Sequence, residues 1–185
     1  KPVDIVQLCK KHLPSILEAN SNLKFIFGSF KQVDKNEAYE ISNISIVESL
    51  YTSLDIVLKQ ARSSICMEYD LGHRSLARSN KQALILVFSN IIHNAVKSLG
   101  GKGNIWFRSK EHQGKLCLHI SNSGPPLPKD IDIFALNTSE SGSTGLGLAI
   151  CKRTMEKIGG TIEIGEGNAE FIVTIPADCK YPEKW

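Results

Sequence analysis

The sequence predicts an α+β fold, a two-layer sandwich in which a mixed, mostly antiparallel sheet is covered by helices on one face. Two observations lead to this prediction. From residue 80 onward, the apolar patterns run in the order helix, two strands, loop, helix and two strands. Glycine-rich stretches separate these elements, and glycine favours turns and helix ends. We expect a short helical segment at 1–40, one domain at 41–177 and a tail at 178–185.

The helices are predicted where apolar residues recur every three or four positions. Residues 46–58 have this spacing, and Ser45 and Glu48 stand at the two positions of a capping box. The strongest pattern covers residues 80–99 and is followed by glycines that end the helix. Its apolar face holds Leu84, Phe88, Ile91, Ala95 and Leu99. A last helix runs to Ile158, where Gly159-Gly160 stops it.

The strands are predicted from β-favouring or alternating segments between turn residues. In one of them, Leu116, Leu118 and Ile120 alternate with more polar residues, as in a half-buried strand. The two central strands meet at Gln113-Gly114, and the last two form a hairpin. The predicted strands are 65–71, 104–109, 115–121, 161–164 and 170–175.

Composition limits the classes of function. Of the 185 residues, 42% are hydrophobic, which is enough for one or two compact domains with a core. The net charge of +3, without a block of Lys or Arg, gives no reason to expect a nucleic-acid partner. No apolar run has the length of a membrane span, so we expect no membrane contact from this part of the chain. Because the chain begins at Lys1 without Met, we expect a piece of a longer protein, which is compatible with a membrane-anchored parent.

The five cysteines are odd in number, scattered and without a CxxC pair. This pattern argues against a zinc finger and against a disulfide framework. We expect reduced thiols, as in a cytoplasmic protein.

Polar residues on the predicted 80–99 helix suggest a first functional group. Asn90, Asn94 and Lys97 follow i, i+4, i+7 spacing and therefore share one face, roughly opposite the apolar one. Two amides beside an ammonium can hold a hydrated Mg²⁺ and polyphosphate oxygens. The alternative is an ordinary solvated helix face, and this helix alone does not decide between the two.

A second group follows a predicted strand directly. In the run Ser121-Asn122-Ser123-Gly124-Pro125-Pro126-Leu127-Pro128, the side chain of Asn122 would project from the strand end. Asparagine, glycine and proline also form plain turns, so this segment by itself leaves both interpretations open.

A third group opens the last helix, within residues 142–151. Gly145 and Gly147 would let backbone N–H groups approach an anion closely, and a helix start adds unpaired donors and a favourable dipole. Ser143 and Thr144 can add hydroxyl groups. The run matches neither GxxxxGK[ST] nor GxGxxG after a strand, which argues against a P-loop and a dinucleotide fold. Alone, it is also compatible with a tight turn.

Taken in order, the three groups closely resemble the ATPase domain of histidine kinases, in the GHKL superfamily with Hsp90, MutL and type II topoisomerases. The Asn-bearing helix of that family is matched by Leu86-Val87-Phe88-Ser89-Asn90-Ile91-Ile92-His93-Asn94-Ala95-Val96-Lys97. The resemblance implies ATP and Mg²⁺ as cofactors and the α+β sandwich known as the Bergerat fold. It implies Asn94 as the Mg²⁺ ligand, with Asn90 and Lys97 near the phosphates.

The second motif of the family, Asp-x-Gly-x-Gly, aligns with Asn122, Gly124 and Pro126, so this chain departs from it twice. The family's Asp accepts a hydrogen bond from the adenine amine. Asn122 can still accept through its carbonyl but lacks the charge, so we expect weaker nucleotide affinity.

The rest of the resemblance concerns the segment that closes over ATP and the end of the domain. Phe134 matches the aromatic residue before that segment, the ATP lid, which would be residues 135–142. The lid-closing motif is matched by Ser143, Thr144, Gly145, Leu146, Gly147 and Leu148, which the resemblance implies as nucleotide-binding residues. Two further segments resemble the ending of sensor kinases specifically, Gly159-Gly160-Thr161-Ile162 and Phe171-Ile172-Val173-Thr174-Ile175-Pro176.

These likenesses imply a bacterial sensor histidine kinase of a two-component system, whose catalytic domain donates the ATP γ-phosphate to a histidine for relay to a response regulator. Residues 1–40 resemble, less specifically, the second helix of a dimerisation and phosphotransfer hairpin, which implies a homodimer. The family phosphorylates a histidine that is followed by an acidic residue, and no histidine here fits: His12 precedes Leu13, His73 falls in a loop of the family, and His93 lies on the Asn helix. We therefore expect the phosphoacceptor outside this chain and identify no catalytic residue within it.

Two alternatives remain open at the level of sequence. One is an anti-sigma-type serine kinase of the same superfamily. The other is a non-catalytic module that acts through protein contacts, suggested by the departures at Asn122 and Pro126. In the leading interpretation, the chain is a cytoplasmic domain of a membrane-anchored sensor.

Overall fold

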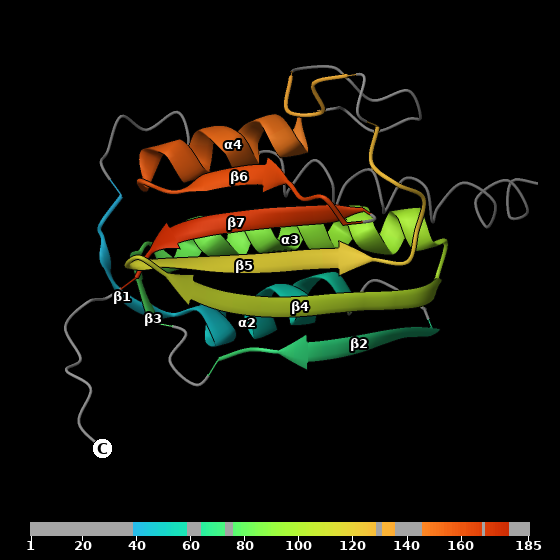
Figure 1. The fold of residues 1–185 in the computed structure, drawn as a ribbon, viewed down its shortest axis with the longest axis horizontal. Coiled ribbons are helices and arrows are strands. Elements are labelled where there is room, and N and C mark those ends of the chain that lie inside the picture. The colour runs from blue at the N-terminus through green and yellow to red at the C-terminus, as the bar shows by residue number, and fades with distance from the viewer. Residues whose placement is uncertain are drawn as a thin grey trace, which may run out of the picture. The chain divides into compact units, whose positions relative to one another are not determined.

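The computed structural model describes residues 39–58, 64–72, 76–128, 131–135, 146–167 and 169–177. The helical segment predicted within 1–40 and the tail at 178–185 lie outside the described residues, apart from residues 39 and 40. The described elements are β1 (Ser42–Ser45), α2 (Ile46–Leu58), β2 (Ser64–Asp70), β3 (Leu76–Ser79), α3 (Lys81–Leu99), β4 (Lys102–His112), β5 (Lys115–Asn122), α4 (Gly147–Lys157), β6 (Thr161–Ile164) and β7 (Glu170–Pro176) (Figure 1).

The main sheet has the strand order β2-β4-β5-β7-β6. Strands β2 and β4 are parallel, and the other three pairs are antiparallel. Along β5 and β7, every second residue is buried and the residues between are partly exposed, so one face of the sheet is covered and the other is more open. The predicted mixed, mostly antiparallel sheet with helices on one face is confirmed.

The local turn chemistry explains several element ends. Gln113 and Gly114 both have positive φ (50° and 70°), as the two-residue turn between β4 and β5 requires. Gly100, with φ 59°, ends α3 in the left-handed conformation, and its N–H donates to the Lys97 carbonyl oxygen. The Ser45 hydroxyl accepts from the N–H of Glu48 at 3.2 Å, which confirms the predicted start of α2.

A small second sheet was not predicted from the sequence. Strands β1 and β3 pair antiparallel, with Ser42 opposite Ser79 and Ser45 opposite Leu76. Each strand has only four residues, too few for a clear alternating pattern, and the pairing joins segments that lie far apart in the sequence. The residues around His73 were expected to form a loop; positions 73–75 lie outside the described residues, and Leu76 begins β3.

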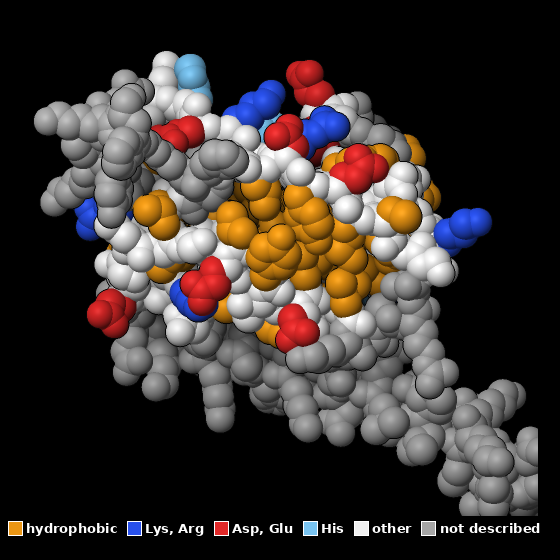
Figure 2. Space-filling model, turned by 90° about the horizontal axis from the view of Figure 1, so that it is seen from below, with side chains coloured by type: hydrophobic (Ala, Val, Ile, Leu, Met, Phe, Trp, Pro, Cys, Tyr) orange, Lys and Arg blue, Asp and Glu red, His pale blue; other side chains and the backbone are white. Residues whose placement is uncertain are grey.

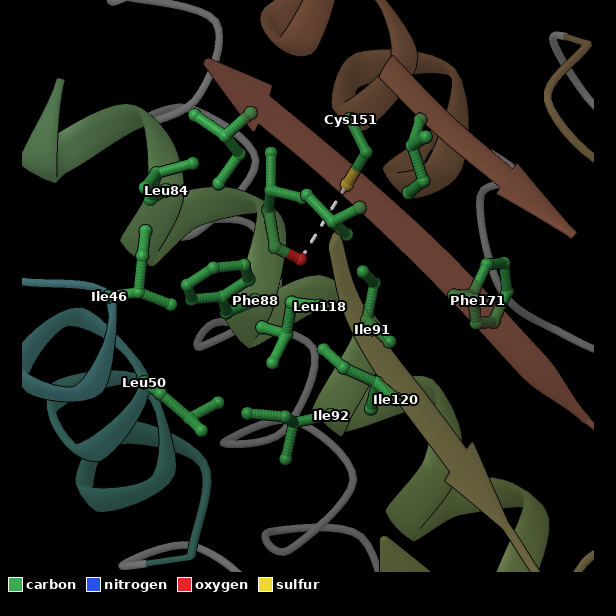
Figure 3. Close-up of a cluster of buried hydrophobic side chains, with 14 of the residues drawn as sticks. Ile46, Leu50, Leu84, Phe88, Ile91, Ile92, Leu118, Ile120, Cys151 and Phe171 are labelled. Carbon is green, nitrogen blue, oxygen red and sulfur yellow. Dashed lines mark hydrogen bonds between the residues drawn. The ribbon is translucent and has the colours of Figure 1, made fainter. Parts of the chain in front are cut away.

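The core fills the space between the helices and the covered face of the sheet. Figure 3 shows Phe88 of α3 among side chains from α2, α3 and β5. Cys151 of α4 lies at the top of the same cluster, away from α2. The predicted inward face of α3 is correct: Leu84, Phe88, Ile91 and Ala95 are buried, while Leu99 is half-buried. The Cys151 thiol contacts the Val87 carbonyl oxygen at 3.9 Å, and its burial raises the pKa of this thiol far above its usual range.

One side of the molecule exposes apolar surface. Figure 2, the view from below Figure 1, shows hydrophobic side chains gathered on this side, where β2 is the edge strand. Tyr51 of α2 is 55% exposed and Tyr69 of β2 is 42% exposed, and the Tyr69 ring stacks on Phe107 with a centroid distance of 5.3 Å. Exposed charges at Glu68 and Asp70 on β2 disfavour pairing of this edge with another strand.

None of the described helices has the length and hydropathy that a membrane crossing needs.

The cap of α3 gives a first test of this fold. The Asn80 side chain accepts from the N–H of Ala83 at 2.9 Å and donates to the Glu40 carbonyl oxygen at 3.1 Å. We expect Asn80→Ala to lower the free energy of unfolding by about 1–2 kcal/mol, because the cap is lost. Asn80→Asp keeps the acceptor and should lose less. Urea denaturation followed by circular dichroism measures both, and equal losses would contradict the capping role.

Candidate functional site

The helices and strands that carry the three sequence motifs begin or end on the same side of the domain. In Figure 1, α3 and β5 end toward the right, the β6–β7 turn lies on the same side, and α4 starts above the middle of α3, where Gly147 approaches Asn90. This convergence follows from topology, because α3 and β5 both run toward this edge while α4 and β7 leave it. The described parts of the three motifs, which come from separate parts of the sequence, therefore lie on the same side of the domain.

The Asn-bearing face of α3 forms one side of this region. Asn90 and Asn94 are half-buried and Lys97 is exposed, in agreement with a polar face away from the core. The Asn90 amide donates to the Leu86 carbonyl oxygen of its own helix at 2.9 Å, which holds this side chain along α3. His93 is exposed on the helix surface, as expected.

The start of α4 packs directly on Asn90. A Cβ atom at Gly147 would lie 2.7 Å from the Asn90 side-chain oxygen, so only glycine allows this approach. Helix α4 begins at Gly147, and the N–H of Ile150 donates to the Leu146 carbonyl oxygen at 2.9 Å. Within the described residues, Leu146 gives the first turn no side-chain cap. The N-cap residue thus leaves the backbone donors of this turn uncapped, and a helix start presents such donors in the way that a phosphate would need.

Part of the third motif lies outside the described residues, namely Ser143, Thr144, Gly145 and most of the predicted lid. Its final members are described: Leu146 precedes α4, and Leu148 is half-buried against the core.

Asn122 is the buried polar residue of this edge, only 5% exposed at the end of β5. Its side-chain oxygen accepts from the N–H of Gly124 at 2.8 Å, and its NH₂ group donates to the Ala169 carbonyl oxygen at 3.3 Å. A Cβ atom at Gly124 would lie 2.5 Å from the Ser98 hydroxyl oxygen, so the chain after β5 passes close to the last turn of α3. The second predicted motif is thus fixed against the first.

Phe134, the predicted aromatic residue before the lid, is held from several sides. The Asp132 carboxylate accepts from the Phe134 N–H at 3.0 Å. The Phe134 ring contacts Phe171 of β7 edge-on, with a centroid distance of 6.4 Å. The ammonium of Lys152 on α4 lies 5.7 Å from the Phe134 ring centre, within cation–π range. The chain therefore enters the lid region from a fixed point.

Sequence reasoning missed several residues of this edge. Ser98 and Lys152 lie on helix surfaces, where one more polar residue carries no signal. Ala169 has φ 44°, and its carbonyl accepts from Asn122; neither property can be seen in an alanine residue of the sequence. The glycines at 165 and 167 are a sequence signal for a tight turn at this point, but they do not indicate its contacts.

Comparison with known proteins shows the family of this domain. The family described as "Histidine kinase-, DNA gyrase B-, and HSP90-like ATPase" matches residues 79–178, more than half of the chain. The chain belongs to this ATPase family. The match begins at the end of β3 and includes every predicted nucleotide-binding residue.

Two curated relatives of this ATPase domain are sensor proteins, and one of them is named a histidine kinase. The C4-dicarboxylate transport sensor protein DctB of Rhizobium meliloti is 35% identical over 96 residues, which are 49% of this chain and 16% of DctB. The sensor histidine kinase DcuS of Escherichia coli is 33% identical over 135 residues, which are 63% of this chain and 25% of DcuS. The chain thus spans a quarter or less of the length of these two relatives.

Solved structures of the histidine kinase ThkA have the same fold. Its catalytic domain is 24% identical with a TM-score of 0.66, and the match covers 74% of this chain and 95% of that one. ThkA in complex with the response regulator protein TrrA is 25% identical with a TM-score of 0.70, covering 96% of this chain and 53% of that one. These structures share the fold, and the family match together with the sensor histidine kinase relative makes the chain a catalytic ATPase domain of the histidine kinase type, which disfavours the serine-kinase and non-catalytic alternatives.

The contact between α3 and α4 can be tested without nucleotide. We expect Gly147→Ala to lower the free energy of unfolding by about 1–3 kcal/mol, because its Cβ would collide with Asn90. In the background of Asn90→Ala, the same substitution should cost little. Urea denaturation of the four proteins of this cycle measures the coupling, and strictly additive effects would contradict a direct contact.

Proposed function

We propose that this edge binds Mg-ATP and presents the γ-phosphate to a histidine outside this chain. The main observation behind this proposal is the close contact between Asn90 and Gly147. It places the Asn-bearing face of α3 next to the first turn of α4. An amide-rich helix face beside a helix start whose N-cap residue, Leu146, makes no side-chain cap suits a polyphosphate and its cation. The family match supports ATP as the ligand.

Each predicted residue is assigned to one part of Mg-ATP. We assign Mg²⁺ to the Asn94 amide oxygen, and the phosphates to Asn90, Lys97 and the backbone donors at the start of α4. Ser143, Thr144 and Gly145 would complete the phosphate contacts from the lid. Asn122 and Gly124 are assigned to the adenine end. A bound Mg²⁺ would neutralise charge on the phosphates, and this chain's own contribution is positioning and hydrogen-bond donation.

The reaction of the whole protein is inferred from its relatives. We infer transfer of the γ-phosphate to a histidine of the same protein and then to a response regulator, by analogy with the complex of ThkA with TrrA. A homodimer and a cytoplasmic position in a membrane-anchored sensor belong to the same inference. We do not assign the phosphoacceptor to His93 or to His119. His93 is an exposed residue of the Asn-bearing helix, and His119 pairs with Glu170.

A thermal melt with and without Mg²⁺ and a non-hydrolysable ATP analogue tests nucleotide binding. At one hundred times its dissociation constant, the ligand should stabilise the domain by about 2.7 kcal/mol, which raises Tm by several degrees. We expect Asn94→Ala to abolish the Mg²⁺-dependent part of the rise. Gln82→Ala, an exposed change near the start of α3, is the matched control and should keep it. No rise at millimolar nucleotide would refute the proposal.

Asn122 stands where the family motif has Asp. Restoring the Asp should therefore affect nucleotide binding and stability in opposite directions. Asn122→Asp should bind Mg-ADP more tightly, because a carboxylate accepts a stronger hydrogen bond from the adenine amine. The same change should lower the free energy of unfolding by about 1 kcal/mol, because the bond to the Ala169 carbonyl is lost. Calorimetric titration and urea denaturation measure the two effects. Equal or weaker affinity in the variant would contradict the assigned role of Asn122.

A further inference from the structure

A paired histidine and glutamate lie on the open face of the sheet, opposite the helices. His119 of β5 and Glu170 of β7 join through the His119 Nδ1 atom and one carboxylate oxygen of Glu170, at 3.1 Å. Both side chains are largely buried, with 24% and 19% of their surface exposed. The second carboxylate oxygen of Glu170 accepts from the N–H of Gly167 at 3.0 Å. Glu170 therefore connects the open face with the β6–β7 turn.

The turn is built around this carboxylate. A Cβ atom at Gly167 would lie 2.8 Å from the Glu170 carboxylate oxygen, and one at Gly165 would collide with the same oxygen. The N–H of Gly165 donates to the Glu170 carbonyl oxygen at 2.9 Å, which closes the hairpin. Ala169 adopts φ 44°, a conformation that costs a non-glycine residue about 1–2 kcal/mol. Glu170 is the next residue in the chain, so its side-chain bonds act directly beside this position.

Ala169, the residue with positive φ, is also the hydrogen-bond partner of Asn122. The Ala169 carbonyl oxygen accepts from the NH₂ group of Asn122, while the N–H of Gly124 donates to the Asn122 oxygen. These two partners fix which side-chain atom is the donor and which is the acceptor. If the Ala169 carbonyl moved away, the amide could turn over and present N–H groups where an adenine amine also presents them.

We propose that Glu170, supported by His119, is a positioning residue for base recognition. It fixes the β6–β7 turn so that the Ala169 carbonyl holds the Asn122 amide in one orientation, in which the amide oxygen accepts from the Gly124 N–H and keeps a second lone pair for the 6-amino group of the base. This inference rests on the proposed function. A carboxylate at position 122 would have two equivalent oxygens and no orientation to select, so the positioning is needed because this chain has asparagine there.

The test uses two nucleotides that differ at the atom in question. Mg-ADP carries a 6-amino group, and Mg-inosine diphosphate carries an oxygen in its place. We expect Glu170→Ala to weaken the affinity for Mg-ADP about fivefold, which corresponds to the loss of roughly one hydrogen bond. The affinity for Mg-inosine diphosphate should stay unchanged or increase. Glu170→Gln keeps an oxygen for the Gly167 N–H and should restore most of the preference for ADP. Glu166→Ala removes an exposed carboxylate of the same turn and should change neither affinity.

Other outcomes separate this inference from a simple loss of structure. If Glu170→Ala weakens both nucleotides equally, the residue only supports the fold and the proposal is overturned. In the Asn122→Asp background, Glu170→Ala should no longer change the ratio of the two affinities, and a persisting effect would also overturn it. If the unaltered protein binds ADP with no preference over inosine diphosphate, the positioning inference fails while the proposed function stands. If it binds neither, the proposed function fails first.

Discussion

The burial of one face of α3 against the sheet is the constraint on which both the core and the site depend. Phe88 and Ile91 point into the core, while Asn90 and Asn94 occupy the other side of the same helix. The helix cannot rotate to expose its polar face further without removing Phe88 from the core, and loss of such a side chain typically costs about 3–5 kcal/mol. The hydrophobic core therefore sets the direction in which the site faces.

Much of the fold could be predicted because its signals are local. The spacing of apolar residues located α2 and α3, and the Gln113-Gly114 pair located the β4–β5 turn. Strands β1 and β3 were missed because their pairing is long-range and each has only four residues. A pattern within one segment cannot report a partner that lies more than thirty residues away in the sequence.

The candidate site was predictable in its residue types but not in their mutual geometry. The sequence indicated Asn90 and Gly147 separately, yet their close contact depends on how α4 packs on α3. Glu170 gave no signal, because an acidic residue on the open side of an alternating strand is ordinary. Its importance comes from its neighbours, Gly167 and His119, which only the folded chain brings to it.

The small β1–β3 sheet determines where the preceding chain joins the domain. Strand β1 leads directly into α2, and β3 ends next to the capping residue of α3, so this sheet lies at the starts of both helices. Figure 1 places it at the opposite edge from the ends of α3 and β5. The 19 residues of α3 correspond to about 28 Å at 1.5 Å per residue. A tether or label attached at residues 39–41 would therefore join the domain at the far end from the edge proposed to bind nucleotide, which makes this end a suitable point for immobilising the protein in binding measurements.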